Sequence, residues 1–368
     1  MSWTTFDDAV TRALATVRRE DYTQHPRLGG VAQSTIQWAI ERDLRRAAIQ
    51  PGMRVLEIGT GTGLTGALLA EIVGPTGHVV SMDIDPALTA RAAEIHAERG
   101  VSNLTVLTGD GRYGAEEHGP FDAIVGWAAP THIPLPWVRQ CRPGAVISTP
   151  IYLAPVARMV GHIRVTVTED GHPTGPELSA AAYIDMGGRI NTTPGVPMFY
   201  LDARQELPGG DLAWLSVAWR EHRTPYDPAD TLCLLLDPDY VESIDLGSSA
   251  EERWVVWRNF RAYCAGRDTR HAFASLTTYG VIGRHCVSGI GFSNGIHVAV
   301  LTADGRILAD HAGSPARAAL IEYYQEWKLG GRIGLSALTP ILEEGPDGWY
   351  VRVVLSPHGT SPWTPVTW

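Results

Sequence analysis

A glycine-rich turn between an apolar strand and an apolar helix is the stretch of this sequence whose residue types could bind a ligand. Residues 54–63 read Arg-Val-Leu-Glu-Ile-Gly-Thr-Gly-Thr-Gly, and an apolar, helix-like segment follows over residues 64–73. A second apolar run, residues 79–83, ends on the acid Asp83. Glycines let a ligand approach the backbone closely, and an acid in this place can accept both hydroxyl hydrogens of a ribose. The pattern predicts a nucleotide site at the turn of a doubly wound α/β unit.

The spacing of the glycines and a nearby acid indicate which kind of nucleotide would bind. In Gly59-Thr60-Gly61-Thr62-Gly63 the third glycine comes two positions after the second, whereas dinucleotide-binding turns place it three positions after. Glu57 lies two residues before the first glycine. There it would repel a pyrophosphate but would suit the ammonium group of an amino acid. S-adenosylmethionine has an amino-acid end and no phosphate, so both details favour it over NAD or FAD.

The elements that must position this turn alternate between helices and strands. Two helices are predicted before it, over residues 6–17 and from Ser34, which is a good N-cap residue. After it, a helix opened by Asp85-Pro86 runs to Arg99. Further strands and one short helical turn follow over residues 104–107, 121–126, 134–140 and 145–148. Because parallel neighbours need a crossover helix, this alternation predicts an α/β fold with a doubly wound, mostly parallel sheet.

The pattern changes after about residue 151. Later strands are expected at the edge of the sheet, over residues 159–167 and 180–186, and a linker over residues 187–197. The remainder predicts an α+β domain, with strands over 212–219, 231–236 and 349–355, two strands within 285–308, and helices over 251–265 and 315–328. We therefore predict two domains, residues 1–190 and 196–368. Trp254 and Trp257 lie at helical spacing, which favours a place in the core of the second domain over a peptide-binding surface.

Composition and charge argue against several classes of function. The chain has 368 residues and a formal net charge of -10, which disfavours a general nucleic-acid binder. It has no long uninterrupted apolar run and no signal-peptide pattern at its start, so we expect no membrane association and a cytoplasmic location. Its four cysteines are scattered without metal-ligand spacing. They predict reduced, mostly buried thiols and no metal site.

The motifs around the glycine turn resemble those of a known family. Residues 55–63 resemble the first motif of class I methyltransferases, and specifically of the protein-L-isoaspartate O-methyltransferases. The resemblance covers roughly residues 18–190. It includes a ribose-binding strand at 77–83, a Gly-Asp-Gly motif within 107–111, a fourth strand at 121–125, the loop at 128–134 and the stretch 140–150. It implies a Rossmann-like class I methyltransferase domain followed by a C-terminal α+β extension. The implied cofactor is S-adenosyl-L-methionine, with S-adenosyl-L-homocysteine as the product.

The resemblance also implies roles for single residues of the cofactor site. By position in the motifs, Glu57, Gly59 and Gly61 would hold the methionine moiety, with Thr60 in the same turn, while Asp83 would bind the ribose, Asp110 the adenine amino group, and Gly111 would supply a backbone contact. The alternative for each is a turn or cap residue of an ordinary α/β domain. For Asp110 the alternative is a turn at the end of its strand.

The acceptor side of such a reaction needs a hydroxyl or amide group to orient a carboxylate. A carboxylate is already ionised at neutral pH, so alignment and exclusion of water would supply most of the rate, and no general base is expected. In the family a serine of a Thr-Ile-Ser-x-Pro segment does this, and residues 33–37 correspond to that segment. Ser34 or Thr35 would supply the hydroxyl here. The alternative is that Ser34 only caps the following helix.

The acceptor side is also where the sequence departs from the family pattern. The proline is replaced in Gln37-Trp38, Leu64 stands where a tyrosine is common, and Gly126-Trp127 stands in place of Val-Thr. The extension after residue 190 has no counterpart in the compact repair enzymes. The donor half of the pattern is thus kept, while the acceptor half is altered.

Three functions fit these observations. We favour methylation of an aspartate side chain in a ribosomally made, constrained peptide such as a lanthipeptide, lasso peptide or graspetide, with the ester then closing to an aspartimide. The alternative is a general protein-L-isoaspartate O-methyltransferase that repairs damaged proteins. A third is a small-molecule carboxyl methyltransferase that carries an interaction module. The first two imply a peptide or protein partner bearing aspartate or isoaspartate.

Overall fold

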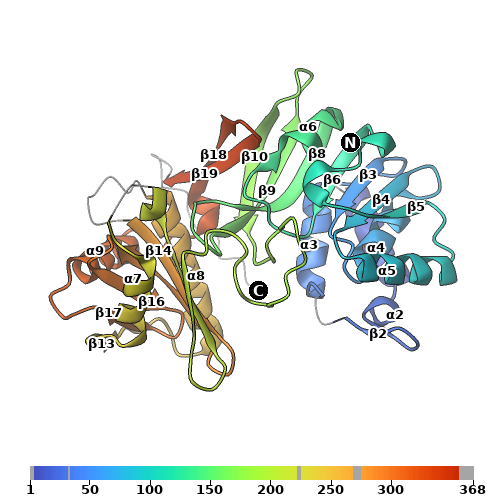
Figure 1. The fold of residues 1–368 in the computed structure, drawn as a ribbon. Helices are drawn as coiled ribbons and strands as arrows, with labels where there is room; N and C mark the ends of the chain where they lie inside the picture. Colours follow the sequence, from blue (N-terminus) through green and yellow to red (C-terminus); the bar gives the residue numbers. More distant parts are fainter. Residues whose placement is uncertain (1–3, 32–33, 222–224, 268–274, 356–368) are drawn as a thin grey trace. The chain divides into compact units, whose positions relative to one another are not determined.

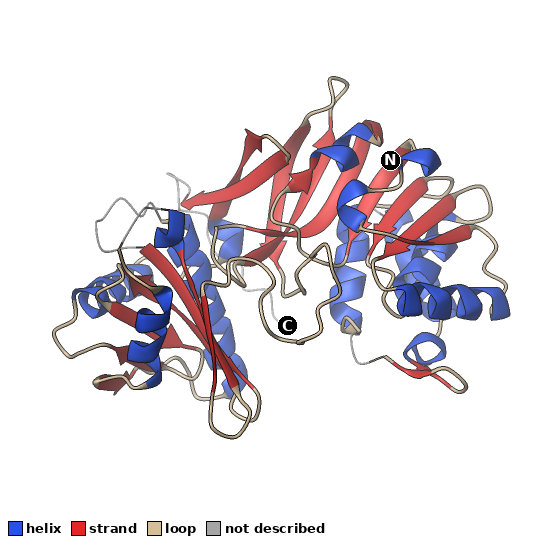
Figure 2. Cartoon of the chain, in the orientation of Figure 1, coloured by secondary structure: helices blue, strands red, loops and turns tan. Residues whose placement is uncertain are grey.

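The computed structural model describes residues 4–31, 34–221, 225–267 and 275–355, and these divide into two compact units (Figure 1). The first unit lies within Met1–Tyr152, Val160–Thr192 and Leu342–Val351, and the second within Leu153–Met159, Thr193–Ile341 and Arg352–Trp368. Each unit combines helices with a seven-stranded sheet (Figure 2). Among the described residues, no helix is both long and apolar enough to cross a membrane.

The sheet of the first unit is mostly parallel. Its strand order is β10-β9-β8-β6-β3-β4-β5. The bounds are β3 Arg54–Ile58, β4 His78–Asp83, β5 Leu104–Thr108, β6 Phe121–Gly126, β8 Cys141–Tyr152, β9 Val160–Val167 and β10 Pro173–Ala180. β3, β4, β5, β6 and β8 run parallel, and β9 and β10 add an antiparallel edge. The predicted doubly wound, Rossmann-like sheet is confirmed.

Helices connect and cover these strands. They are α1 Thr4–Thr16, α2 Arg19–Thr23, α3 Gln37–Ala47, α4 Leu64–Val73, α5 Pro86–Glu98 and α6 Leu135–Arg139. β3 is buried from Val55 to Ile58, as expected for a parallel strand with both faces covered. From β3 the chain steps to β4 and β5 on one side, and then to β6 and β8 on the other. Ligands of doubly wound sheets bind at this switch point, beyond the carboxyl ends of the strands.

A hairpin from near the end of the chain contributes residues 342–351 to the first unit. The strands β18 (Leu338–Gly345) and β19 (Gly348–Leu355) form a small sheet with β7 (Ile133–Pro134). Trp349 pairs with Ile133, and both side chains are buried. The indole of Trp349 also meets the ring of His172 edge-on, with the ring centroids 5.8 Å apart. Residues 342–351 therefore belong to the first unit, although the second unit separates them from it in sequence.

The second unit is built on an antiparallel sheet. Its order is β11-β12-β14-β15-β16-β17-β13. The strands are β11 Ala203–Glu206, β12 Leu212–Val217, β13 Tyr240–Ser243, β14 Ser275–Ile282, β15 Val287–Ser293, β16 Val298–Thr302 and β17 Arg306–Ala309, and the helices are α7 Pro228–Leu236, α8 Ala250–Gly266 and α9 Pro315–Leu329. Leu232 of α7 packs in a cluster with Val300, while Tyr323 of α9 contacts Phe292. Phe292 pairs with Ala299, the neighbour of Val300, so α7 and α9 cover opposite faces.

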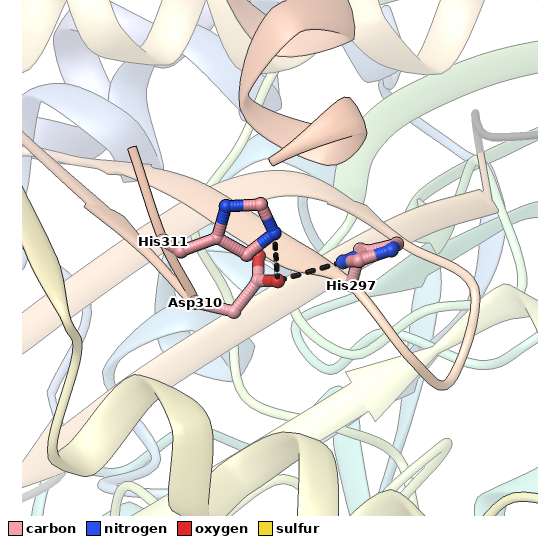
Figure 3. A group of neighbouring side chains, drawn as sticks. All are labelled: His297, Asp310 and His311. Carbon is pink, nitrogen blue, oxygen red and sulfur yellow. Dashed lines mark hydrogen bonds and ion pairs between the residues drawn. The ribbon is translucent and has the colours of Figure 1, made fainter. Parts of the chain in front are cut away.

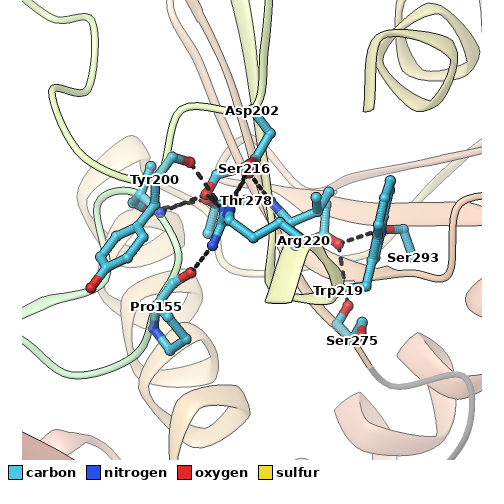
Figure 4. A network of polar contacts seen from close by, with 12 residues as sticks. Pro155, Tyr200, Asp202, Ser216, Trp219, Arg220, Ser275, Thr278 and Ser293 are labelled. Carbon is cyan, nitrogen blue, oxygen red and sulfur yellow. Dashed lines mark hydrogen bonds and ion pairs between the residues drawn. The ribbon is translucent and has the colours of Figure 1, made fainter. Parts of the chain in front are cut away.

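A polar network centred on Arg220 fixes residues 153–159 to the second unit (Figure 4). Its guanidinium donates to the carboxylate of Asp202, to the carbonyls of Pro155 and Tyr200, and to Ser216 Oγ. The amide of Ala157 donates to the same Ser216 Oγ at 2.8 Å. Arg220 and Asp202 are mostly buried, with 21% and 10% of their side-chain surfaces exposed. This network ties a loop to the sheet through bonds that burial strengthens.

Two predicted strands are wrong. Residues 231–236 lie in helix α7, because Asp227 caps it by accepting from the amide of Ala229 at 2.9 Å and Pro228 occupies its first turn. A short apolar run does not by itself distinguish a strand from a buried helix. The strand expected over 180–186 is absent beyond Ala180, where β10 ends, and Asp185 makes an isolated bridge with Ala129.

Two predictions about side chains also need correction. Trp257 is buried as predicted, but Trp254 is 41% exposed and stacks on Trp257 with the ring centroids 5.2 Å apart. The four cysteines are free, yet only Cys264 is buried. Cys233 and Cys286 are exposed, because they lie on the outer side of α7 and in the turn before β15.

Candidate functional site

The glycine turn after β3 is held in a conformation that favours glycine. Gly59, Gly61 and Gly63 have φ angles of 99°, 51° and 86°, in the left-handed region. The amide of Gly59 donates to the carbonyl of Met82 at 2.7 Å, which ties the turn to β4. A Cβ at Gly59 would lie 3.4 Å from Cβ of Trp127, in van der Waals contact with it. The absence of side chains here keeps the backbone accessible to a ligand.

Asp83 closes the other side of this turn. It is half-buried at the end of β4, and its Oδ2 accepts from the amide of Gly61 at 2.9 Å. Its Oδ1 accepts from the amide of Asp85 at 3.1 Å. Each carboxylate oxygen has a second lone pair, so Asp83 can still accept hydrogen bonds from the hydroxyls of a ribose.

Glu57 is fully buried beneath the turn. Its Oε1 accepts from Trp127 Nε1 at 3.0 Å, and its Oε2 from Ser81 Oγ at 2.5 Å. Ser81 Oγ in turn lies 2.7 Å from Thr60 Oγ1. Burial raises the pKa of Glu57 to about 7, although these hydrogen bonds oppose the shift. The carboxyl group therefore connects the turn to β4 and to Trp127.

Asp110 lies at the carboxyl end of β5, where it caps a short 3-10 helix. Its Oδ1 accepts from the amide of Arg112 at 3.0 Å, and its Oδ2 pairs with the guanidinium of Arg112 at 2.6 Å. Burial alone would raise the pKa of Asp110, but the bonds and charge of Arg112 outweigh it and lower that pKa. A Cβ at the buried Gly111 would collide with Ile58. Asp110 is thus ionised, and Gly111 packs directly against the end of β3.

Ser34 and Thr35 precede helix α3, but neither caps it. The helix begins at Gln37 with Ile36 in the capping position, and no side chain bonds its first turn. The predicted helix start at Ser34 is therefore wrong. The reason lies in Arg19 of α2, whose Nη2 donates to Ser34 Oγ at 2.7 Å and to the carbonyl of Thr35 at 2.8 Å. These bonds hold the segment extended before the helix starts.

A small cavity brings the two halves of the candidate site together. Its lining consists of Ser34, Thr35, Ile40, Gly59, Thr60, Gly61, Thr62, Leu64, Thr65 and Trp127. The hydroxyl-bearing segment and the glycine turn thus face the same space. Glu57 is reached from this lining through Trp127, whereas Asp110 and Gly111 lie outside it.

Two residues of this site were missed by the sequence reasoning. Trp127 stood out only as a departure from the family pattern, and nothing in that pattern placed its indole over the turn. Arg19 gave no signal, because its contact with Ser34 depends on how α2 packs before the loop. Both follow from tertiary structure and not from local spacing.

The fold and the position of this turn are those of class I methyltransferases. A family model described as Protein-L-isoaspartate(D-aspartate) O-methyltransferase (PCMT) matches residues 4–190. The chain belongs to this family. The matched region ends at residue 190, so most of the second unit lies outside it.

Individual relatives match parts of the first unit. A protein-L-isoaspartate O-methyltransferase of Ignicoccus hospitalis is 39% identical over 105 residues, which are 28% of this chain and 50% of the relative. A second, from Polaromonas sp., is 32% identical over 151 residues, or 41% of this chain and 68% of the relative. The chain thus spans about half the length of the first relative. A solved protein-L-isoaspartate O-methyltransferase shares 16% identity at a TM-score of 0.46, covering 96% of this chain and 100% of that one.

Proposed function

We propose that this chain is an S-adenosyl-L-methionine-dependent carboxyl O-methyltransferase that methylates L-isoaspartyl residues of peptides or proteins. The observation that carries the proposal is the cavity lined by Ser34 and Thr35 on one side and by residues 59–62 on the other. It is supported by membership of the family and by the names of the curated relatives. A protein of this family from Plasmodium falciparum is described in complex with S-adenosyl-L-homocysteine.

The first unit offers groups of the right chemistry for the cofactor. The backbone at Gly59 and Gly61, with Thr60 between them and Glu57 beneath the turn, would accommodate its amino-acid end, and Asp83 would accept the ribose hydroxyls. Asp110 and Gly111, which lie outside the cavity lining, would hold its adenine. When bound, S-adenosyl-L-methionine supplies an electrophilic methyl group, and S-adenosyl-L-homocysteine remains as product. No metal is needed for this chemistry, because the acceptor carboxylate is already a nucleophile.

Ser34 is the better of the two hydroxyl candidates for orienting the acceptor. Arg19 Nη2 donates to Ser34 Oγ, so that oxygen is used as an acceptor and its own hydrogen is free to be donated. A carboxylate is the natural recipient of that hydrogen. The charge of Arg19 also favours a carboxylate nearby, and the ion pairs of the described residues include none to Arg19. Arg19 acts here as a positioning residue, while Ser34 touches the substrate.

A second candidate function is favoured by Trp127. This residue lines the cavity and stands where the family pattern has threonine, so the space for the acceptor is reshaped. A narrower space for the acceptor would suit an aspartate in a constrained, ribosomally made peptide. Its methyl ester would be attacked by the following backbone nitrogen, with loss of methanol, to give an aspartimide. The names of the relatives support isoaspartate repair better than this alternative.

The second unit has a separate place in the proposal. It lies mostly outside the family model and exposes Trp254, which suits recognition of a peptide or protein substrate. If it has this role, Trp254→Ala raises KM for a peptide substrate and leaves kcat unchanged. An unchanged KM would contradict a role for Trp254 in recognition of the peptide.

The two candidates are separated by one assay of the full-length chain. It is incubated with labelled S-adenosyl-L-methionine and, in parallel, an isoaspartyl peptide, the matching aspartyl peptide, and a macrocyclic peptide with one aspartate. Methyl ester on the isoaspartyl peptide alone supports repair. Methylation of the macrocycle alone, followed by loss of methanol, supports the second candidate. No transfer to any of the three, with cofactor binding retained, contradicts both.

The roles of Ser34 and Arg19 are tested with Ser34→Ala, Thr35→Val, Arg19→Lys and Arg19→Gln. We expect Ser34→Ala to slow transfer and Thr35→Val to have little effect, with cofactor affinity unchanged in both. Arg19→Gln should raise KM for the peptide, and Arg19→Lys should restore part of it because the charge returns. Arg27→Gln is the matched control, since Arg27 pairs with Glu94 and Glu98 on the surface. Slower transfer in Thr35→Val alone would assign the role to Thr35.

A further inference from the structure

A cluster of two histidines and one aspartate lies in the second unit, whereas the candidate site belongs to the first (Figure 3). His297 immediately precedes β16, and Asp310 and His311 immediately follow β17. These two strands are antiparallel neighbours, so the start of one lies beside the end of the other. The topology therefore brings together residues that the sequence separates. For this reason the sequence shows no metal-ligand spacing that would predict the cluster.

The three side chains converge on one oxygen atom. Asp310 Oδ2 lies 2.7 Å from His297 Nδ1 and 3.5 Å from His311 Nε2 (Figure 3). One nitrogen or oxygen from each residue falls within 4.8 Å of the others. Ligand atoms about 2.0–2.2 Å from a shared metal ion are themselves about 3.0–3.5 Å apart at tetrahedral or octahedral angles. The distances from Asp310 Oδ2 to the two histidine nitrogens, 2.7 Å and 3.5 Å, bracket that range.

The support around the cluster holds the aspartate and leaves the histidines accessible. Asp310 is 6% exposed, and its Oδ1 accepts from the amide of Val298 at 3.1 Å, which orients the carboxylate. His297 is 27% exposed and His311 48%. A fixed carboxylate between two imidazoles that reach solvent has an entry path for an ion.

We propose that His297, Asp310 and His311 bind one divalent transition-metal ion of the zinc class. Two imidazole nitrogens and one carboxylate oxygen suit Zn²⁺, Co²⁺ or Fe²⁺, whereas Ca²⁺ and Mg²⁺ prefer oxygen ligands. Three protein ligands leave at least one position for water or for a carboxylate of a bound peptide. This site is independent of the methyl-transfer function, and neither depends on the other.

Binding requires a small rearrangement of protons and of His311. The ion replaces the hydrogen that His297 Nδ1 shares with Asp310, and that hydrogen moves to Nε2. The amide of Gly313 donates to His311 Nδ1 at 3.1 Å, which places the hydrogen of the neutral ring on Nε2. Coordination through Nε2 therefore shifts the hydrogen to Nδ1 and turns the exposed Gly313 amide to solvent. Because His311 is exposed, its ring is able to rotate so that Nε2 coordinates the ion.

The experiment is a titration of the full-length chain with Zn²⁺ by calorimetry, repeated with Co²⁺ to record the visible absorption of a bound ion. Because Cys233 and Cys286 are exposed and could bind zinc by themselves, both titrations use the chain carrying Cys233→Ser and Cys286→Ser. We expect one ion per chain and a nitrogen-oxygen Co²⁺ spectrum.

Variants decide whether these three residues are the ligands. His311→Ala removes an exposed ligand and should weaken binding by more than about 100-fold, beyond the 10- to 100-fold typical of losing a supporting partner. Asp310→Asn should do the same; its folding is checked by circular dichroism, since Asp310 is buried. His285→Ala, at another exposed histidine of this unit, is the control and should bind normally. No stoichiometric binding, or equal affinity in His311→Ala and His285→Ala, would overturn the proposal and leave a hydrogen-bonded cluster without an ion.

Discussion

Gly59 is the residue whose lack of a side chain affects the pocket most directly. Its φ of 99° is in a region that alanine enters at a cost of about 1–2 kcal/mol, and a Cβ there would come into contact with Trp127. We expect Gly59→Ala to lower both the free energy of unfolding and the affinity for S-adenosyl-L-methionine, measured by calorimetry. Gly100→Ala is the control, because Gly100 has a φ of 69° and open space around it. Equal loss of cofactor affinity in both variants would remove the special role of Gly59.

Glu57 makes the stability of the first unit depend on pH. Its pKa is raised to about 7 from an ordinary value of 4.5, so between these values the folded protein retains a proton that the unfolded chain releases. Stability contributed by the protonated form is therefore complete below about pH 4.5 and falls as pH rises towards 7. The loss approaches about 3 kcal/mol above pH 7, at about 1.4 kcal/mol per pKa unit.

This dependence is measured by urea unfolding from pH 5 to pH 8. Glu57→Gln keeps an acceptor for Trp127 and a polar partner for Ser81, so its stability should change less over that range than that of the unmodified chain. Glu71→Gln, at an exposed glutamate of α4, serves as the control and should follow the unmodified chain. Parallel curves for Glu57→Gln and the unmodified chain would show that Glu57 does not carry the effect.

The residues of the turn were predictable because their chemistry is local. Glycines at fixed spacing and an acid at the end of a strand indicate a local backbone conformation. Such a conformation can be predicted from the sequence alone. Arg19 and Trp127 could not be found in that way, since their contacts with Ser34 and Glu57 join segments far apart in the chain. The same holds for His297 and Asp310.

Among the elements, the loop over residues 153–159 is held in part by Arg220, which donates to the carbonyl of Pro155. Ala157 of the same loop also bonds Ser216 and Thr278. Arg220→Met would leave Asp202 nearly buried without its cation, which costs about 3–5 kcal/mol. We expect the unfolding transition of the second unit to shift accordingly in differential scanning calorimetry. Arg306→Met removes an ion pair that is about half exposed and should change stability by about 1 kcal/mol or less. A small effect of Arg220→Met would mean that solvent replaces the network readily.

The elements differ in how well the sequence predicts them. β3, β4 and the crossover helices were predictable, because apolar runs flanked by turn residues repeat at regular intervals. Helix α7 was mistaken for a strand because its apolar run is short. The capping bond of Asp227 and the proline in the first turn distinguish the helix from a strand. The short strands β7 and β11 have no period to detect, and tertiary pairing alone defines them.

For the molecule as a whole, the hairpin of β18 and β19 decides whether the first unit is complete. Trp349 is buried against Ile133 and His172, so Trp349→Ala should destabilise the first unit by about 3–5 kcal/mol. Trp254→Ala removes a half-exposed side chain from the second unit and should cost less. The two transitions are followed by calorimetry with and without the cofactor, which stabilises only the unit that binds it. An unchanged first transition in Trp349→Ala would contradict the assignment of the hairpin.

The return of residues 342–351 to the first unit changes how the second unit is attached. Its largest segment, residues 193–341, is an insertion between two segments of the first unit and not a tail added after it. During synthesis the ribosome must therefore make residues 193–341 of the second unit before β19 can pair with β7. Until then β7 lacks its partner strand β19 and its edge stays unpaired. In this interval the nascent chain is most exposed to incorrect strand pairing.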